Sequence, residues 1–313
     1  MKQKIGVLVM SYGTPQSLDQ VEAYYTHIRR GSAPSPEQLK ELKDRYEAIV
    51  GGFFPLRQNT DRQVDALQET LSRNTQDKEV EFVVYQGLKH AFPFIEDGVQ
   101  QMAEDGITHG IGIVLAPHYS IMSVGSYVKR AEEKAAEVGV TMSFIRDYHL
   151  HPQLLKALAQ RVSQKLDQFE EAGAARDDVK VLFSAHSLPA KILEMGDPYQ
   201  DQLLETSAAV ADMTGVKDWQ FTWQSAGRTA TPWLGPDILD TLKTLSAEQI
   251  EYVLVAPIGF VSDHLEVLYD LDIEAQAAAE ELDMRLMRTD SLNTDPLYME
   301  TLSDTIITAW EKE

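Results

Sequence analysis

A buried strand that ends in a histidine is predicted by the stretch Val181-Leu182-Phe183-Ser184-Ala185-His186-Ser187-Leu188-Pro189. Short apolar runs bounded by turn residues are typical of strands in a parallel sheet. A second stretch has the same form, because Val7-Leu8-Val9-Met10-Ser11 leads into Tyr12-Gly13-Thr14-Pro15. Alignment of the two prolines, Pro15 and Pro189, places Tyr12 opposite His186. The two stretches therefore indicate an internal repeat.

Two further pairs of segments follow in the same order and support the repeat. The first pair consists of Tyr85-Gln86-Gly87 with Pro93-Phe94-Ile95, and of Trp223-Gln224-Ser225 with Pro232-Trp233-Leu234. The second pair consists of Val114-Leu115-Ala116-Pro117 and Leu254-Val255-Ala256-Pro257, and it brings Ser126 opposite Glu266. Matches in one shared order predict two similar halves that divide near His151-Pro152.

The fold class predicted from this pattern is α/β. Strands that alternate with longer helical patterns indicate βαβ units around a parallel sheet. We expect two Rossmann-like lobes, an N-terminal one over residues 1–150 and a C-terminal one over residues 151–313, with their sheets facing a central cleft. Ligands bind at the carboxyl ends of such strands, so Tyr12 is expected on one wall of the cleft and His186 on the other. Strands are predicted at 5–10, 80–85, 110–115, 179–183, 220–223 and 252–255.

Composition and missing motifs exclude several classes of protein. The 313 residues include no cysteine, so any metal site must use His, carboxylate, Tyr or backbone oxygen. The formal net charge of −21 argues against nucleic acid as a partner. No Walker A loop, dinucleotide fingerprint, HExxH motif or nucleophile elbow is present. No apolar run approaches the ~20 residues of a membrane span, so we expect a cytoplasmic protein without a stable membrane anchor.

His186 follows directly after an apolar strand, at the predicted carboxyl edge of a sheet. One interpretation is a structural histidine that only forms hydrogen bonds. The other is a base or metal ligand, since an imidazole with a pKa near ~6.5 can accept a proton or bind a divalent metal at neutral pH. Its position at the carboxyl edge favours the second interpretation.

Glu266, Asp270 and Glu274 are spaced four residues apart and therefore lie on one face of a predicted helix. Like charges at this spacing repel, so the face is either solvated or compensated by a cation. Oxygen ligands suit hard divalent ions. A ridge of carboxylates in a cleft would recruit and relay a hydrated cation.

A basic and aromatic cluster near the N-terminus contrasts with the overall acidity. It consists of Tyr24-Tyr25-Thr26-His27-Ile28-Arg29-Arg30, followed by Lys40, Lys43, Arg45 and Tyr46. It is either a solvated helix face with its tyrosines packed inward or a grip for a flat, polyanionic ligand.

These segments resemble the ferrochelatase family. The strand with Ser184-Ala185-His186-Ser187-Leu188-Pro189, followed by the turn Gly196-Asp197-Pro198-Tyr199, is similar to the signature of that family. The blocks Trp223–Ser225, Pro232–Pro236 and Gly259–Asp270 match in the same order, so the resemblance covers about Ile5 to Glu274. It implies a chelatase-like fold with a metal-insertion site in the C-terminal lobe. The candidate catalytic residues and metal contacts are His186, Glu266 and Tyr12. The spacing on the helix adds Asp270 and Glu274 as further candidate metal contacts.

The subtype that the sequence resembles is the coproporphyrin ferrochelatase of Gram-positive bacteria, on the segments Met10–Pro15 and Tyr24–Gly31. Protoporphyrin ferrochelatases usually have Leu-Gly-Gly-Pro where this chain has Tyr12 to Pro15. The resemblance implies that Tyr12 approaches iron from the face opposite His186 and that the N-terminal lobe carries an insertion that grips the porphyrin. The substrate-binding residues that it implies are Arg29, Arg45, Tyr46 and Tyr127. Further candidates are Arg30 from the basic and aromatic cluster, and Ser225 and Trp233 from the matching blocks.

One segment departs from the family pattern. The family usually has Gly-Gly-x-Ser-Pro-Leu, with the serine near a propionate, whereas this chain has Gly51-Gly52-Phe53-Phe54-Pro55-Leu56. Phe54 has no hydroxyl and cannot donate that hydrogen bond.

We therefore expect an enzyme that replaces two pyrrole protons of coproporphyrin III with Fe(II), giving coproheme in haem biosynthesis. His186 is the candidate base, Glu266 orients it or takes protons onward, and Tyr12 offers an oxygen to iron. No cofactor beyond Fe(II) is expected, apart from an accessory divalent cation at Asp270 and Glu274, and the chain is expected to be a monomer. Two alternatives stay open, a noncatalytic porphyrin or metal carrier of the same fold and a cobalt or nickel chelatase for another tetrapyrrole.

Overall fold

The computed structural model of the chain describes residues 2–49, 54–227 and 229–312. They form two compact units. Unit 1 combines the described residues of Met1–Pro117, Ser123–Tyr148 and Asn293–Glu313, and unit 2 combines His118–Met122 with His149–Leu292. Residues 118–122 and 293–312 therefore each pack in the unit that holds the other half of the sequence.

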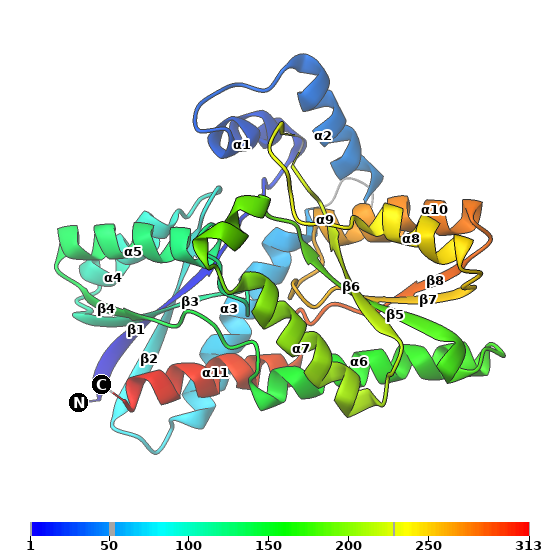
Figure 1. Cartoon of the computed structure of the whole chain (residues 1–313). Coiled ribbons are helices and arrows are strands. Elements are labelled where there is room, and N and C mark those ends of the chain that lie inside the picture. The colour runs from blue at the N-terminus through cyan, green and yellow to red at the C-terminus, as the bar shows by residue number, and fades with distance from the viewer. Residues whose placement is uncertain (1, 50–53, 228, 313) are drawn as a thin grey trace. The chain divides into compact units, whose positions relative to one another are not determined.

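Unit 1 is built on a parallel four-stranded sheet in the order β2-β1-β3-β4 (Figure 1). The strands are β1 Gln3–Ser11, β2 Val80–Leu88, β3 His109–Val114 and β4 Thr141–Phe144. The helices are α1 Val21–Ile28, α2 Pro36–Ala48, α3 Pro55–Asn74, α4 Ile95–Glu104, α5 Val124–Val138 and α11 Pro296–Trp310, with a 3-10 turn at Leu18–Gln20. Glu300 of α11 accepts hydrogen bonds from Arg73 Nη2 at 2.5 Å and Asn74 Nδ2 at 2.8 Å, which attaches the end of the chain to α3.

Unit 2 has a parallel four-stranded sheet in the order β6-β5-β7-β8. The strands are β5 Val179–His186, β6 Trp219–Gln224, β7 Tyr252–Ala256 and β8 Arg285–Arg288. The α-helices are α6 Pro152–Glu171, α7 Tyr199–Thr214, α8 Ile238–Ala247, α9 Leu265–Leu268 and α10 Gln276–Glu281. Between α9 and α10 lies a π-helix, Asp270–Ala275, and two 3-10 turns span Arg176–Asp178 and Ala190–Met195.

The shared strand order of the two sheets confirms the predicted α/β class and the internal repeat. β1 and β5 hold equivalent positions, each between the second and third strands of its unit. Every predicted strand is present. Two strands, β4 and β8, were not predicted. Each has four residues, lies at a sheet edge and mixes polar with apolar side chains. A half-exposed edge strand carries no continuous apolar run to mark it.

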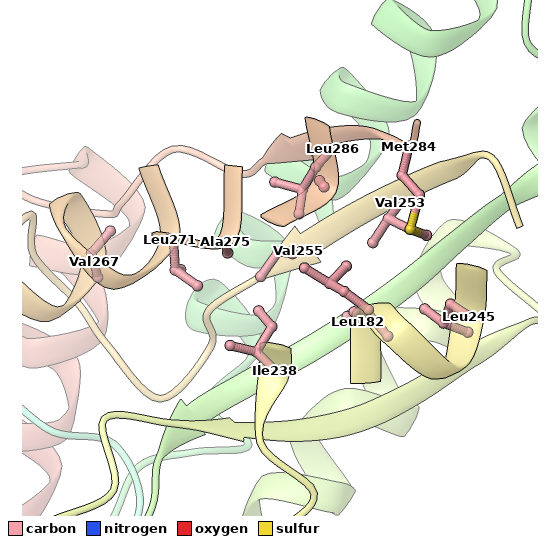
Figure 2. Close-up of a cluster of buried hydrophobic side chains, with 12 residues drawn as sticks. Leu182, Ile238, Leu245, Val253, Val255, Val267, Leu271, Ala275, Met284 and Leu286 are labelled. Atoms are coloured by element: carbon pink, nitrogen blue, oxygen red, sulfur yellow. The ribbon is translucent and has the colours of Figure 1, made fainter. Parts of the chain in front are cut away.

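The apolar core of unit 2 anchors the segment that carries the predicted acidic ridge. Val267, Leu271 and Ala275 are fully buried and lie in one cluster with Val255 of β7 and Ile238 of α8 (Figure 2). A fully buried Val or Leu side chain contributes about 1.5–3 kcal/mol. Repulsion between like charges four residues apart costs only about 0.2–0.5 kcal/mol per pair. Burial of the apolar stripe therefore outweighs the repulsion along the neighbouring acidic stripe.

The described helices include none that combines the length and the apolar character needed to cross a bilayer.

Candidate functional site

His186 is the last residue of β5, at the carboxyl edge of the sheet of unit 2. Two hydrogen bonds fix the backbone here. Tyr199 Oη donates to His186 O at 3.1 Å, and the next residue, Ser187, donates its N–H to Gln224 O at 2.8 Å. The loop after β7 passes close to β5 at Gly259. A Cβ at position 259 would lie 2.3 Å from Ala185 Cβ, so only glycine permits this approach.

Glu266 lies between two imidazoles. Its Oε1 is 3.4 Å from His186 Nε2, and its Oε2 is 3.6 Å from His264 Nε2. The Nδ1 of each imidazole contacts a backbone carbonyl, that of Ser187 for His186 and that of Ser262 for His264, the latter at 2.9 Å. A carbonyl oxygen only accepts hydrogen bonds, so Nδ1 carries a proton in both rings. Each Nε2 therefore faces the carboxylate.

This arrangement favours a protonated His186. Burial alone would lower the pKa of His186, but the charge of Glu266 and hydrogen bonding to Glu266 and to the Ser187 carbonyl raise it to about 9. Burial alone would raise the pKa of the Glu266 carboxyl, yet the charge of His186 and contacts with both imidazoles hold it well below its usual range. An imidazolium and a carboxylate thus face each other while about a third of each side chain is exposed.

Gln224 braces the backbone beneath this pair. Its fully buried amide accepts from Ser184 Oγ at 2.9 Å and donates to Glu266 O at 2.9 Å. One side chain at the end of β6 thereby joins β5 to the segment after β7. Gln224 and His264 are absent from the predicted site. The signal that could have found His264 is its position in the sequence, two residues before Glu266 in the same segment.

The three carboxylates of the predicted acidic ridge have different surroundings. Glu266 contacts imidazoles, Asp270 is 7% exposed and accepts a hydrogen bond from Ser225 Oγ, and Glu274 is exposed. The helix that carries Asp270 and Glu274 is a π-helix rather than the expected α-helix, and Glu274 N donates to Tyr269 O, five residues back, at 2.9 Å. Single π-turns occur often at functional sites.

Ser225 and Trp233, both predicted substrate contacts, lie beside this group. Ser225 follows β6 with a positive φ of 60°, which is uncommon for a residue with a side chain. The Trp233 ring is 6.4 Å from the His186 ring, centroid to centroid, and its Nε1 donates to Thr229 Oγ1 at 2.8 Å. Unit 2 therefore brings five predicted site residues together: His186, Glu266, Asp270, Ser225 and Trp233.

Tyr12 lies in unit 1, directly after β1, and is 41% exposed. Its ring is 4.7 Å from the ring of His90, which follows β2, and His90 N donates to Tyr12 O at 3.0 Å. His90 Nδ1 is 3.0 Å from Nδ1 of His27, so one of these nitrogens donates and the other accepts. Burial, followed by the charges of Lys89, His27 and Arg130, lowers the pKa of His90 to about 3. A neutral imidazole therefore supports the Tyr12 ring.

The residues of the predicted grip lie in unit 1, and several of them pair a cation with an aromatic ring. Arg29 ends α1 and lies over the Tyr25 ring at 5.6 Å, and Arg30 follows in a left-handed conformation at φ 56°. Lys89 Nζ donates to Ser126 Oγ at 2.8 Å and lies 4.8 Å from the centre of the buried Tyr127 ring. Burial of Lys89, with the charges of Arg130 and Arg30, lowers its pKa to about 8. Lys89 was not predicted, because a single lysine after a strand carries no distinctive pattern.

Arg45 and Tyr46 lie near the end of α2, which begins at Pro36 with a capping box. Ser35 Oγ accepts from Gln38 N at 3.2 Å, and Gln38 Oε1 accepts from Ser35 N at 3.0 Å. The Tyr46 hydroxyl is buried and lies 3.1 Å from Thr14 Oγ1, which ties α2 to the segment after Tyr12.

Phe54, where the family usually has serine, is 6% exposed and packs its ring 4.7 Å from that of Tyr46. The preceding residues of the departure, Gly51, Gly52 and Phe53, lie outside the described residues. Phe54 thus extends the aromatic packing around Tyr46.

The predicted site residues fall into two sets, one in each unit. Tyr12, Arg29, Arg30, Arg45, Tyr46 and Tyr127 belong to unit 1, and the remainder belong to unit 2. The approach of Tyr12 to the metal from the face opposite His186 stays a prediction. Within the described part of the chain, no group of three or more His, Asp and Glu side chains is arranged to hold a metal ion.

Known proteins resemble this chain in sequence and in fold. The sequence model named Ferrochelatase matches residues 4–309. A coproporphyrin III ferrochelatase from Oceanobacillus iheyensis is 45% identical and aligns with 98% of this chain and 97% of its own. A ferrochelatase from Herpetosiphon aurantiacus is 45% identical and aligns with 98% of this chain and 99% of its own. The solved structure of SirB from Bacillus subtilis with Fe³⁺ has a similar fold, with a TM-score of 0.61 and 13% identity over 99% of this chain and 98% of that chain.

Proposed function

The chain belongs to the ferrochelatase family, and from this membership we propose that it inserts Fe(II) into coproporphyrin III to give coproheme in haem biosynthesis. In the reaction the porphyrin loses its two pyrrole N–H protons, and its four nitrogens bind Fe(II). The protein must therefore hold the ring, deliver a divalent cation and remove protons. Coproporphyrin III and Fe(II) are the substrates, and no other cofactor is required.

The observation that carries this proposal is the placement of Glu266 between His186 and His264 at the carboxyl edge of the sheet of unit 2. Two imidazoles and a carboxylate form a short line in which the carboxylate stabilises positive charge on the imidazoles. His186 is partly exposed at one end of that line, where a ring nitrogen of the substrate can reach it. General acid–base catalysis of this kind contributes about 10²–10⁴-fold to a rate.

The proton transfers follow from the charges of the pair. His186 is held as an imidazolium, so it becomes a base only after it gives up a proton. Because its pKa is held low, Glu266 stays a carboxylate that orients His186 and stabilises the imidazolium, and the partly exposed His186 gives its proton to solvent. Neutral His186 then accepts a pyrrole proton through Nε2 or contacts the entering Fe(II) through the same atom. Tyr12 offers its oxygen to iron from the far face of the ring.

The shape of the substrate matters because the N–H protons of a flat porphyrin fill its centre. A saddled ring tilts pyrrole nitrogens out of the plane and toward a base. We propose that side chains around the macrocycle hold it in this shape, with Trp233 beside His186 as one such contact.

Coproporphyrin III as the substrate is supported by the positive charges in unit 1. Arg29, Arg30, Arg45 and Lys89 combine cations with the aromatic rings of Tyr25 and Tyr127. A porphyrin with four propionates gains more from such charges than one with two. The relative from Oceanobacillus iheyensis is named for the same porphyrin.

Asp270 and Glu274 are proposed to take part in supplying the metal, including an accessory divalent cation. Asp270 is fixed by Ser225, and Glu274 is exposed at the surface, where a hydrated cation can reach it. Carboxylate oxygens suit such ions. We propose that the protein acts as a monomer in the cytoplasm.

Anaerobic metallation with coproporphyrin III and protoporphyrin IX in parallel tests the proposal. We expect many turnovers of coproporphyrin III to coproheme, followed by absorbance, and slower conversion of protoporphyrin IX. Binding of coproporphyrin III and Fe(II) without acceleration over the uncatalysed reaction would instead identify a carrier. Insertion of Co(II) or Ni(II) into another tetrapyrrole, with no activity on coproporphyrin III, would identify a different chelatase.

A further inference from the structure

Each strand of the sheet in unit 2 ends next to a residue that contacts the segment 263–274. β5 ends in His186, which faces Glu266, and β6 is followed by Ser225, which donates to Asp270. β7 leads into the segment itself. β8 ends in Arg288, a residue to which the proposed function assigns no role.

Arg288 binds this segment at two points. Its Nε and Nη2 donate to the two carboxylate oxygens of Asp272 at 2.6 and 2.9 Å. Its Nη2 is also 3.7 Å from Asp263 Oδ1, which in turn accepts from Ser291 Oγ at 2.8 Å. The remaining nitrogen, Nη1, donates to Thr289 O at 2.9 Å. The Arg288 side chain is only 14% exposed, whereas that of Asp272 is 37% exposed.

The two points enclose Glu266 and Asp270, and Glu274 lies two residues beyond the second point. Asp263 precedes Glu266, and Asp272 lies between Asp270 and Glu274. Ser225 holds Asp270 from the β6 edge of the sheet, whereas Arg288 holds Asp272 from the β8 edge. Two contacts from opposite edges define the rotation of the π-helix about its axis.

We propose that Arg288 is a positioning residue that fixes the rotation of the π-helix and thereby places Asp270 and Glu274 to supply the metal. This inference rests on the proposed function for the metal and extends it to a residue outside the reacting centre. Its chemical basis is the fork of the guanidinium, which engages both oxygens of Asp272 at once. A lysine would keep the charge but cannot form that paired contact.

The test compares Arg288→Gln and Arg288→Lys with Arg285→Gln. Arg285 lies in the same strand, is exposed and has its guanidinium 6.0 Å from the Phe169 ring, so it controls for loss of a positive charge from β8. We expect both Arg288 variants to raise the apparent KM for Fe(II) about tenfold, as loss of a charge-assisted contact predicts. We expect kcat and the KM for coproporphyrin III to change less than about twofold, and Arg285→Gln to behave like the parent protein.

Hydrogen exchange tests, without turnover, whether Arg288 holds the π-helix in place. The amides of Ile273 and Glu274 donate to Tyr269 O within the π-helix, and they should exchange faster in both Arg288 variants and in Asp272→Asn. The parent protein could fail to metallate coproporphyrin III while exchange still rises in the variants. The proposed function would then be wrong, and the hold of Arg288 on the π-helix would be supported. Faster exchange with an unchanged metal KM would overturn the positioning role. Full recovery of the metal KM in Arg288→Lys would show that charge alone suffices and would overturn the role of the fork.

Discussion

Glu266→Gln should move the pH dependence of metallation, because Glu266 is the main group that raises the pKa of His186. With the pKa raised to about 9, only about 1% of His186 is neutral at pH 7. Glutamine keeps the size of the side chain and removes its charge. Because both side chains are about a third exposed, solvent screens part of the interaction. We therefore expect the pKa of His186 to fall by about one to two pH units.

The assay is the pH profile of kcat/KM for coproporphyrin III at saturating Fe(II), measured anaerobically between about pH 6 and pH 10, because this ratio reports the pKa of the enzyme without bound porphyrin. In the parent protein the rate should rise with pH as His186 loses its proton, and it should reach half of its maximum near pH 9. In Glu266→Gln the rise should occur at lower pH. The plateau should fall at least about a hundredfold, because the carboxylate that orients the imidazole of the base is missing.

A control variant and a direct titration test whether Glu266 raises the pKa of His186. Glu274→Gln removes the same charge from an exposed position of the same segment and should leave the position of the rise unchanged. NMR titration of His186 Hε1 should show the lowered pKa directly, without turnover. An identical pKa of His186 in the parent protein and Glu266→Gln would refute the pairing of the two residues as the cause of the raised value.

Other substitutions test the remaining parts of the site. His186→Ala should lower metallation at least about a hundredfold and leave the chain folded by circular dichroism, because the backbone hydrogen bonds at the end of β5 are retained. Ser225→Ala removes the hydroxyl bound to Asp270 and should raise the KM for Fe(II) about threefold to tenfold at constant kcat. Arg45→Ala should weaken coproporphyrin III binding about 10- to 150-fold and protoporphyrin IX binding less, measured by fluorescence quenching.

Each of these outcomes has a contradicting result. More than about a tenth of the parent rate in His186→Ala would argue against a general base at this position. A lower kcat with an unchanged metal KM in Ser225→Ala would separate Asp270 from supply of the metal. Equal loss of both porphyrins in Arg45→Ala would show that this arginine does not select for the number of propionates.

The amino-acid sequence by itself determined the architecture and the position of the central histidine. Apolar runs of strand length, alternating with helical patterns, encode burial locally, so β1, β2, β3, β5, β6 and β7 could be predicted. The repeat of strand followed by turn and proline placed Tyr12 and His186 at equivalent strand ends, because both halves use one strand order. Glu266 and Asp270 were found from their spacing on a helix, together with the resemblance to the ferrochelatase family.

The tertiary structure alone decided which side chains meet. His264 and His186 lie 78 positions apart in sequence yet contact the same carboxylate, and Arg288 reaches Asp272 across 16 positions. Such pairs depend on which strand ends are neighbours in the sheet, and no local pattern encodes that order. The π-turn at Asp270–Ala275 was equally hidden, because an apolar residue at every fourth position can face the core in an α-helix and across a π-turn. The raised pKa of His186 follows from this assembly, since only the folded chain brings its imidazole against Glu266.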